Sequence, residues 1–371
     1  MKIVLRKCCW RMLLLAPLIL ASCAAPAPAS KPISKLSPEN ALFDLEQEGL
    51  KLLWRQELGK RTDAPLRDIY CTGNIVVVEA EGGELHCLKS SDGTWKATRL
   101  LGDRLTRAPK AQGQRLYLVI KNNLYIFDTA SGGLSGAYRP GFAIFTPPQV
   151  YGDSLILAGG NGHLRRMMLD APRKGWLTSL EGPILEEPVI AEDRVFAAAC
   201  YDKVIAVQAE DGLVLWKWKP REPSRISSGV AVLGHRLFVG DDRGFIYSLR
   251  ADYGEPTWKM MAGASIVGRP RVVGTDVLVF TARPSLISIA AGGDMQTLWE
   301  CEGATELVAA GETTAYVLTE DHSVVALCLE TGKEMWRHPL PVDCEITGDP
   351  TRAAFYIVNS KGSIVALGEL D

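Results

Sequence analysis

Residue types that could support catalysis or metal binding are spread thinly along this chain. The histidines show none of the H-x₃-H or H-E-x-x-H spacings that bring two imidazoles onto one metal ion. They are His86, His163, His235, His322 and His338. His86 and His163 are expected at solvent-facing positions beside strands, and no serine stands in a G-x-S-x-G elbow. The sequence therefore predicts no catalytic, metal-binding or cofactor-binding residue.

Two short stretches could be mistaken for ligand loops. Asp241-Asp242-Arg243-Gly244 lacks the alternating oxygen ligands and the distal Glu of a calcium loop. Gly159-Gly160-Asn161-Gly162 is followed by neither the Lys nor the helix of a phosphate-binding loop. We interpret both stretches as turns between strands.

The cysteines suggest structural roles. Cys200 and Cys328 are expected to be small core residues, and Cys301 and Cys344 are the pair least unfavourably placed for a disulfide. The only adjacent pair, Cys8-Cys9, lies close to the start of the chain.

The first 22 residues predict export. A basic start is followed by a short apolar run over 12–20, too short for the roughly 20 residues of a membrane span. The run closes on Leu20-Ala21-Ser22-Cys23, which resembles the bacterial lipobox. That resemblance implies cleavage after residue 22 and lipid on Cys23. An ordinary signal peptide followed by a chance cysteine is the alternative.

Residues 23–50 are expected to carry the lipidated Cys23, an Ala/Pro-rich extended tether and one short helix around Leu42, Phe43 and Leu45. By resemblance to proteobacterial sorting, Ala24 in place of Asp implies the outer membrane, facing the periplasm. Without the four basic residues of the signal, the 41 basic residues fall to 37 against 43 acidic ones, a balance of −6. This balance argues against a nucleic-acid partner.

Residues 51–371 repeat one pattern at steps of 38 to 42 residues. Each copy contains a residue pair in which a usually small residue precedes an apolar one: Cys87-Leu88, Ile126-Phe127, Arg166-Met167, Ala206-Val207, Ser248-Leu249, Ser288-Ile289, Ala326-Leu327 and Ala366-Leu367. The small residue fails only at Ile126 and Arg166. A period near forty, divisible into four short strands, predicts the blade of a propeller. In the fourth copy we expect strands ending at 191 and spanning 194–200, 204–209 and 213–217.

An aromatic residue closes each copy. The column consists of Trp54, Trp95, Tyr138, Trp176, Trp216, Trp258, Trp299 and Trp336. Its regular spacing favours packing on the neighbouring blade over ligand stacking. After Ala366 too few residues remain for an outer strand, and 52–58 reads as an outer strand with none before it. Their pairing predicts an all-β, eight-bladed propeller of four-stranded antiparallel blades, closed by the N-terminal strand.

The stretch Ala326-Leu327-Cys328-Leu329-Glu330-Thr331-Gly332-Lys333-Glu334-Met335-Trp336 resembles the repeat of the pyrroloquinoline-quinone-type β-propellers. Length, lipobox, tether and blade number are together similar to the lipoprotein propellers of the outer-membrane β-barrel assembly machinery. That resemblance implies a non-enzymatic scaffold that binds a protein partner, with no cofactor. The quinone-dependent dehydrogenases of the same family imply the alternative, a quinone- or small-ligand-binding propeller.

Two connections rich in proline and arginine, 219–225 and 269–271, stand out between the predicted outer and inner strands. They could line one face or the central channel and meet an acidic partner. A simple solvated connection is the other interpretation. For a third function, polysaccharide binding, the sequence offers no motif.

Overall fold

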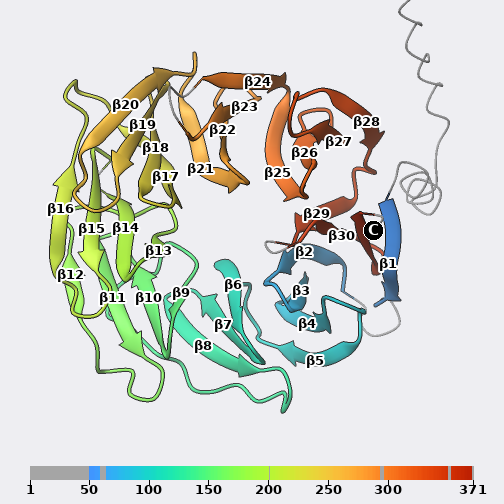
Figure 1. Cartoon of the computed structure of the whole chain (residues 1–371). Coiled ribbons are helices and arrows are strands. Elements are labelled where there is room, and N and C mark those ends of the chain that lie inside the picture. Colours follow the sequence, from blue (N-terminus) through green and yellow to red (C-terminus); the bar gives the residue numbers. More distant parts are fainter. Residues whose placement is uncertain (1–49, 59–63, 200, 293–295, 350–351, 370–371) are drawn as a thin grey trace, which may run out of the picture. The chain divides into compact units, whose positions relative to one another are not determined.

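The computed structural model describes residues 50–58, 64–199, 201–292, 296–349 and 352–369 (Figure 1). The described residues all belong to the unit Pro38–Asp371. The expected signal peptide, Cys23, the tether, the short helix and Cys200 therefore lie outside the described residues.

The described secondary structure consists of strands, in short antiparallel sheets built mostly from strands consecutive in the chain. The first four sheets contain β2 (Leu66–Cys71), β3 (Ile75–Ala80), β4 (Glu84–Lys89) and β5 (Trp95–Leu100); β6 (Arg107–Gln112), β7 (Arg115–Ile120) and β8 (Asn123–Asp128); β9 (Gln149–Tyr151), β10 (Ser154–Ala158), β11 (His163–Met168) and β12 (Leu177–Ser179); and β13 (Val189–Ala191), β14 (Arg194–Ala199), β15 (Lys203–Gln208) and β16 (Val214–Trp218).

The remaining strands continue the series. They are β17 (Ile226–Leu233), β18 (Arg236–Asp241), β19 (Phe245–Arg250) and β20 (Pro256–Met261); β21 (Ile266–Val273), β22 (Asp276–Thr281), β23 (Ser285–Ala290) and β24 (Thr297–Glu302); β25 (Ala304–Ala310), β26 (Thr314–Thr319), β27 (Ser323–Cys328) and β28 (Glu334–Pro339); and β29 (Cys344–Gly348), β30 (Ala354–Asn359) and β31 (Ser363–Glu369). One parallel bridge, Ser228 to Gly268, joins the sheets of β17 and β21. The prediction of an all-β fold of four-stranded antiparallel sheets is confirmed in this coarse form.

The core lies between the sheets. The second and third strands of a sheet read as almost continuous apolar runs because both of their faces are covered. In β3 all six residues are buried, and Val77 packs in one cluster with Leu118 of β7 and Phe127 of β8. Most such clusters join two sheets that follow one another in the chain, and one joins the sheet of β2 to β5 with the sheet of β1, β31 and β30. Within the described ranges, no helix is long and apolar enough to cross a membrane.

The sheet β6-β7-β8 has three strands, which differs from the four-stranded pattern expected for every copy. In place of the fourth strand, the following segment makes two isolated bridges, Phe127 to Leu134 and Leu124 to Tyr138. The segment 129–148 contains three prolines and four glycines. Proline lacks the amide hydrogen that a ladder needs, and glycine weakens a strand, so pairing does not continue.

The N-terminal strand β1 (Leu50–Glu57) pairs antiparallel with the last strand, β31, in the order β1-β31-β30-β29. The register places Leu52 opposite Leu367 and Trp54 opposite Ala366, with a bulge between Leu52 and Trp54. Strand β1 thus begins at Leu50, one residue before the expected boundary at 51.

Four of the repeat tryptophans contact the glycine of the next copy. The indole Nε1 of Trp216 donates to the carbonyl of Ala251 at 3.0 Å, and a Cβ on Gly254 would lie 2.5 Å from the Trp216 ring. Trp54, Trp176 and Trp299 repeat this arrangement with Ser90, Ala209 and Leu329 as acceptors and with Gly93, Gly212 and Gly332 beneath the rings. The turn glycine and the tryptophan of the preceding copy therefore fit together as a pair.

Candidate functional site

The connection between β16 and β17, residues 219–225, is the most distinctive loop of those singled out by sequence, and we call it the basic connection. Pro220 and Pro223 keep it out of the sheets because neither has an amide hydrogen to donate. With Asp202, Asp242 and Arg243 it lines a cavity of 530 Å³. The basic connection therefore lies against the β14–β15 and β18–β19 turns.

Two hydrogen bonds to Asp242 hold the C-terminal end of the basic connection. The amide of Arg225 donates to Oδ1 of Asp242 at 2.9 Å, and the amide of Asp242 donates to the carbonyl of Arg225 at 2.9 Å. The Arg225 guanidinium lies 4.7 Å from the ring centre of Tyr201, which is 42% exposed. This cation–π contact presents a cation and an aromatic ring together at the surface.

The neighbouring turn is fixed by Asp241, a fully buried carboxylate. It accepts the amides of Arg243 at 3.1 Å and Phe245 at 2.8 Å, and the hydroxyl of Tyr247 at 2.8 Å. Burial, reinforced by Asp241, raises the pKa of Tyr247. Both oxygens of Asp241 thus stabilise the turn itself, which agrees with the interpretation of 241–244 as a turn.

The charges of the basic connection are only partly compensated by ion pairs. Glu222 accepts a hydrogen bond from Arg243 at 2.8 Å and lies 3.8 Å from the ammonium of Lys259. Lys219 and Arg221 are exposed and take part in no ion pair among the described residues. The basic connection can therefore offer two cations to an acidic partner without breaking an internal pair.

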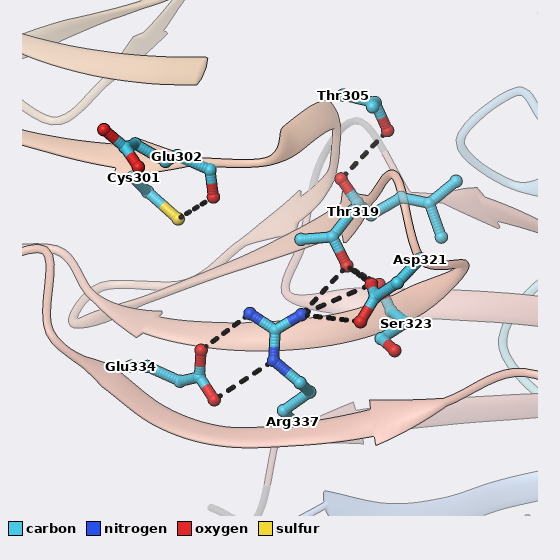
Figure 2. Close-up of polar contacts among 9 residues, drawn as sticks. Cys301, Glu302, Thr305, Thr319, Asp321, Ser323, Glu334 and Arg337 are labelled. Atoms are coloured by element: carbon cyan, nitrogen blue, oxygen red, sulfur yellow. Dashed lines mark hydrogen bonds and ion pairs between the residues drawn. The ribbon is translucent and has the colours of Figure 1, made fainter. Parts of the chain in front are cut away.

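Arg337 of β28 shows the opposite arrangement. Its guanidinium lies 2.8 Å from a carboxylate oxygen of Glu334 and 3.2 Å from one of Asp321, on the β26–β27 turn (Figure 2). The two ion pairs of Arg337 thus connect β28 with the β26–β27 turn. All three nitrogens of this guanidinium thus have acceptors within the chain.

The second arginine-rich stretch, 269–271, lies within β21 and faces the space between the innermost strands. Arg271 lines a polar cavity of 530 Å³ together with Lys110, Glu187 and Glu306. This cavity fits the expectation that the stretch lines the channel.

Glu187 connects several inner strands across this space. Its carboxylate lies 2.7 Å from Lys110 of β6, 2.5 Å from the amide nitrogen of Gln149 of β9, and 3.9 Å from Arg269 of β21. Burial alone would raise the pKa of Glu187, but Lys110, Arg269 and Gln149 outweigh it and hold that pKa below its usual value. Glu187, Lys110 and Arg269 thus form a charge network that is paired within the chain.

A metal-dependent role finds no matching donor set in the described part of the chain. There, no three His, Cys, Asp or Glu side chains lie together in a way that could hold a metal ion. A polar, metal-competent cluster at the channel mouth would favour the quinone alternative. The structure provides the polarity without such a grouping of described residues.

Three expectations are wrong: the solvent-facing position of His86, the core position of Cys328, and the disulfide between Cys301 and Cys344. His86 is fully buried in β4, where its ring lies 5.3 Å from that of Trp95, so this polar residue is not solvent-facing. Cys328 ends β27 and is partly exposed, so it is not a core residue.

Cys301 and Cys344 are both free thiols. The thiol of Cys301 contacts the carbonyl of Glu302 on its own strand at 3.8 Å (Figure 2). Cys344 is buried in another sheet, in a cluster with Phe355 and Leu367. The proposed disulfide between these residues is therefore wrong.

The stacked antiparallel sheets of three or four strands, the repeating Trp–Gly contacts and the polar cavity beside the inner strands define a β-propeller of the pyrroloquinoline-quinone-like repeat class. A family model described as "Outer membrane protein assembly factor BamB" matches residues 42–139, 143–226 and 203–371. The chain belongs to this family.

Individual relatives are distant. BamB of Burkholderia pseudomallei is 22% identical over 339 residues, covering 87% of this chain and 77% of the relative. BamB of Moranella endobia is 25% identical over 169 residues, so the alignment spans 41% of this chain and only 43% of that protein. A quinohemoprotein alcohol dehydrogenase of Pseudomonas putida is 24% identical over 44% of this chain and 20% of its own length.

A solved structure shares the fold. The crystal structure of BamB from Moraxella catarrhalis superposes with a TM-score of 0.68 at 15% identity, over 86% of this chain and 97% of that one. Together with the family match, this similarity confirms the membership of the propeller family that the repeat predicts.

Proposed function

We propose that this chain is a lipid-anchored, non-enzymatic scaffold in outer-membrane protein assembly, and that its basic connection receives an acidic segment of a protein partner in the envelope. The name of the family and its match along most of the chain support the process. The observation that carries the site is the exposed, unpaired state of Lys219 and Arg221 among the described residues.

The scaffold we propose is an eight-bladed closed ring. Eight successive groups of three or four strands support the count. The pairing of β1 with β31, and the contacts of β2 with β29 and β30, support closure. A closed ring leaves no unpaired edge at the chain ends and is a rigid platform for surface loops.

The anchor we propose is lipid on Cys23, with residues 1–22 removed and an Ala/Pro tether and one short helix before the first strand. Leu20-Ala21-Ser22-Cys23 and the Ala/Pro composition that follows support this arrangement. It would hold the propeller at the periplasmic side of the outer membrane, within reach of the barrel-assembly machinery.

Co-purification tests the proposed site. The double variant Lys219→Glu/Arg221→Glu should lose capture of its envelope partner, because two attractive charges become repulsive. Lys96→Glu/Arg99→Glu on β5 changes the same number of exposed charges elsewhere and should retain capture. Equal capture by both variants, or recovery of no assembly component by the native chain, would reject the proposal.

A second candidate is a small-ligand binder, supported by the polar channel cavity and by the dehydrogenase relative. Titration of the purified chain with pyrroloquinoline quinone distinguishes the two functions. Saturable binding that Arg271→Ser abolishes would favour the ligand-binding function. The scaffold proposal expects no saturable binding.

A further inference from the structure

A cavity of 690 Å³ lies between the irregular segment after β8 and the β11–β12 loop. Its walls come from 137–140 and 171–174, with Arg165 and Met167 of β11 between them. This size falls in the range of small-molecule pockets, about 300–1,000 Å³. The cavity is too small for a folded partner and large enough for a compact ligand.

Four cations and no carboxylate line this cavity. The cations are Arg139, Arg165, Arg173 and Lys174. None of the four belongs to an ion pair within the described ranges, and the acidic residue of the same loop, Asp170, lines a different cavity. Clustered cations without counter-charges repel one another, so this arrangement favours an anionic ligand.

Arg165 is the built-in member of the group. Its guanidinium donates to the carbonyl of Pro140 at 3.3 Å and to that of Pro172 at 3.1 Å, and so ties the two walls together. A guanidinium carries five N–H donors, and these two bonds leave others for a ligand. Arginine forks match the oxygen pairs of phosphate groups well.

The rest of the lining is apolar. Tyr138, Met167, Pro140 and Pro172 stand beside the cations, and Met167 is buried. A ligand that fills the cavity would therefore carry both an anionic group and an apolar part. A phosphate ester with hydrocarbon attached has this chemistry.

The cavity also lies where the repeat departs from its pattern. The adjoining sheet lacks its fourth strand, and Tyr138 is the only residue of the aromatic column that is not Trp. The small residue of the repeat is replaced at Ile126 and Arg166, in these same two copies. Both the sequence and the structure thus single out this part of the fold.

We propose that this cavity binds a phosphate-bearing amphiphile, with the phosphate among the four cations and the hydrocarbon on the Tyr138–Met167 side. The headgroup of an anionic membrane phospholipid and a soluble phosphate ester share this chemistry. The proposal is independent of the basic connection, which belongs to different sheets and lines a different cavity.

Calorimetric titration of the purified full chain tests it, with three probes: sn-glycerol 3-phosphate, dihexanoyl phosphatidylglycerol and dihexanoyl phosphatidylcholine. We expect the phosphatidylglycerol to bind most tightly, because it alone combines a net anion with hydrocarbon. Arg139→Ser/Arg173→Ser/Lys174→Ser should weaken its binding about tenfold, because three nearby charges are removed. Lys96→Ser/Arg99→Ser/Lys333→Ser, a matched set of exposed cations, should leave binding unchanged.

Several results would overturn the proposal. Equal binding of phosphatidylcholine would remove the role of the cations, and an equal loss in both triple variants would make the effect non-specific. Affinity for glycerol 3-phosphate equal to that for phosphatidylglycerol would identify a soluble ester and reject the amphiphile. Displacement of phosphatidylglycerol by an acidic hexapeptide at lower concentration than glycerol 3-phosphate would assign the cavity to a protein segment. Thermal unfolding of each variant verifies that the fold is retained.

Discussion

Glu187 forms ion pairs with Lys110 of β6 and Arg269 of β21. Replacing Glu187 therefore tests how much this charge network stabilises the fold. Glu187→Gln should lower the free energy of unfolding by about 1–2 kcal/mol at pH 7, because hydrogen bonds from charged donors are lost. Lys110 and Arg269 hold the pKa of Glu187 below its usual value despite burial. The stabilisation is therefore present above the usual carboxyl pKa and disappears as pH falls through the lower, folded-state pKa.

Urea unfolding at pH 7 and pH 3 measures this effect, with Glu302→Gln on β24 as an exposed control. The difference between native chain and Glu187→Gln should shrink at the lower pH. A difference that is constant with pH would mean that the charge of Glu187 does not contribute.

Thiol accessibility is a second test at the residue scale. Cys87 is fully buried, and burial raises its pKa to about 12. Cys328 is partly exposed, and hydrogen bonds from Thr331, then from the backbone of that turn, lower its pKa. Because the thiolate is the reactive form, maleimide should label Cys328 well before Cys87 in the folded chain. Mass spectrometry of labelled peptides measures the order, and simultaneous labelling would contradict the assigned burial.

Several of these residues could not be assigned from sequence. The partners of Glu187 come from three other repeats, and only the curvature of the stacked sheets brings them together. The polarity of His86 predicts a surface position, yet contact with Trp95 and with Thr98 Oγ1 at 3.5 Å accommodates it inside. Side-chain partners that depend on tertiary packing leave no local pattern.

At the scale of the element, the Trp–Gly contact explains why a glycine precedes the outer strand. Gly254→Ala should destabilise the fold about 2 kcal/mol more than Gly234→Ala, because overpacking adds to backbone strain. Both glycines have positive φ, +72° and +55°, but only Gly254 has a ring where the methyl group would lie. Equal losses in urea unfolding would show that the glycine is required for its turn alone.

Strands were predictable where repeats are regular. In the fourth copy the expected strands coincide with β13 to β16 within two residues, since turn residues such as Asp211-Gly212 end each apolar run. The fifth copy, which contains β17 to β20, follows the same rule. The second copy does not, because the prolines and glycines after β8 break the ladder where a periodic reading would continue it.

At the scale of the whole molecule, ring closure predicts the protection of the last strand. If β1 stays paired, β31 has a hydrogen-bonded neighbour on each side, β1 and β30. Its amides should then exchange as slowly as those of β15. If β1 frays, β31 becomes an edge and should exchange as fast as the outer strand β16. Hydrogen–deuterium exchange of the peptides that contain these three strands distinguishes the outcomes.

The central claim is that the basic connection is where this scaffold meets its partner. The most direct measurement places a photo-crosslinking amino acid at Arg221, and in a second strain at Lys96, and irradiates intact cells. We predict that position 221 captures a component of the outer-membrane assembly machinery and that position 96 does not. Capture of the same component from both positions, or from neither, would contradict the proposed site.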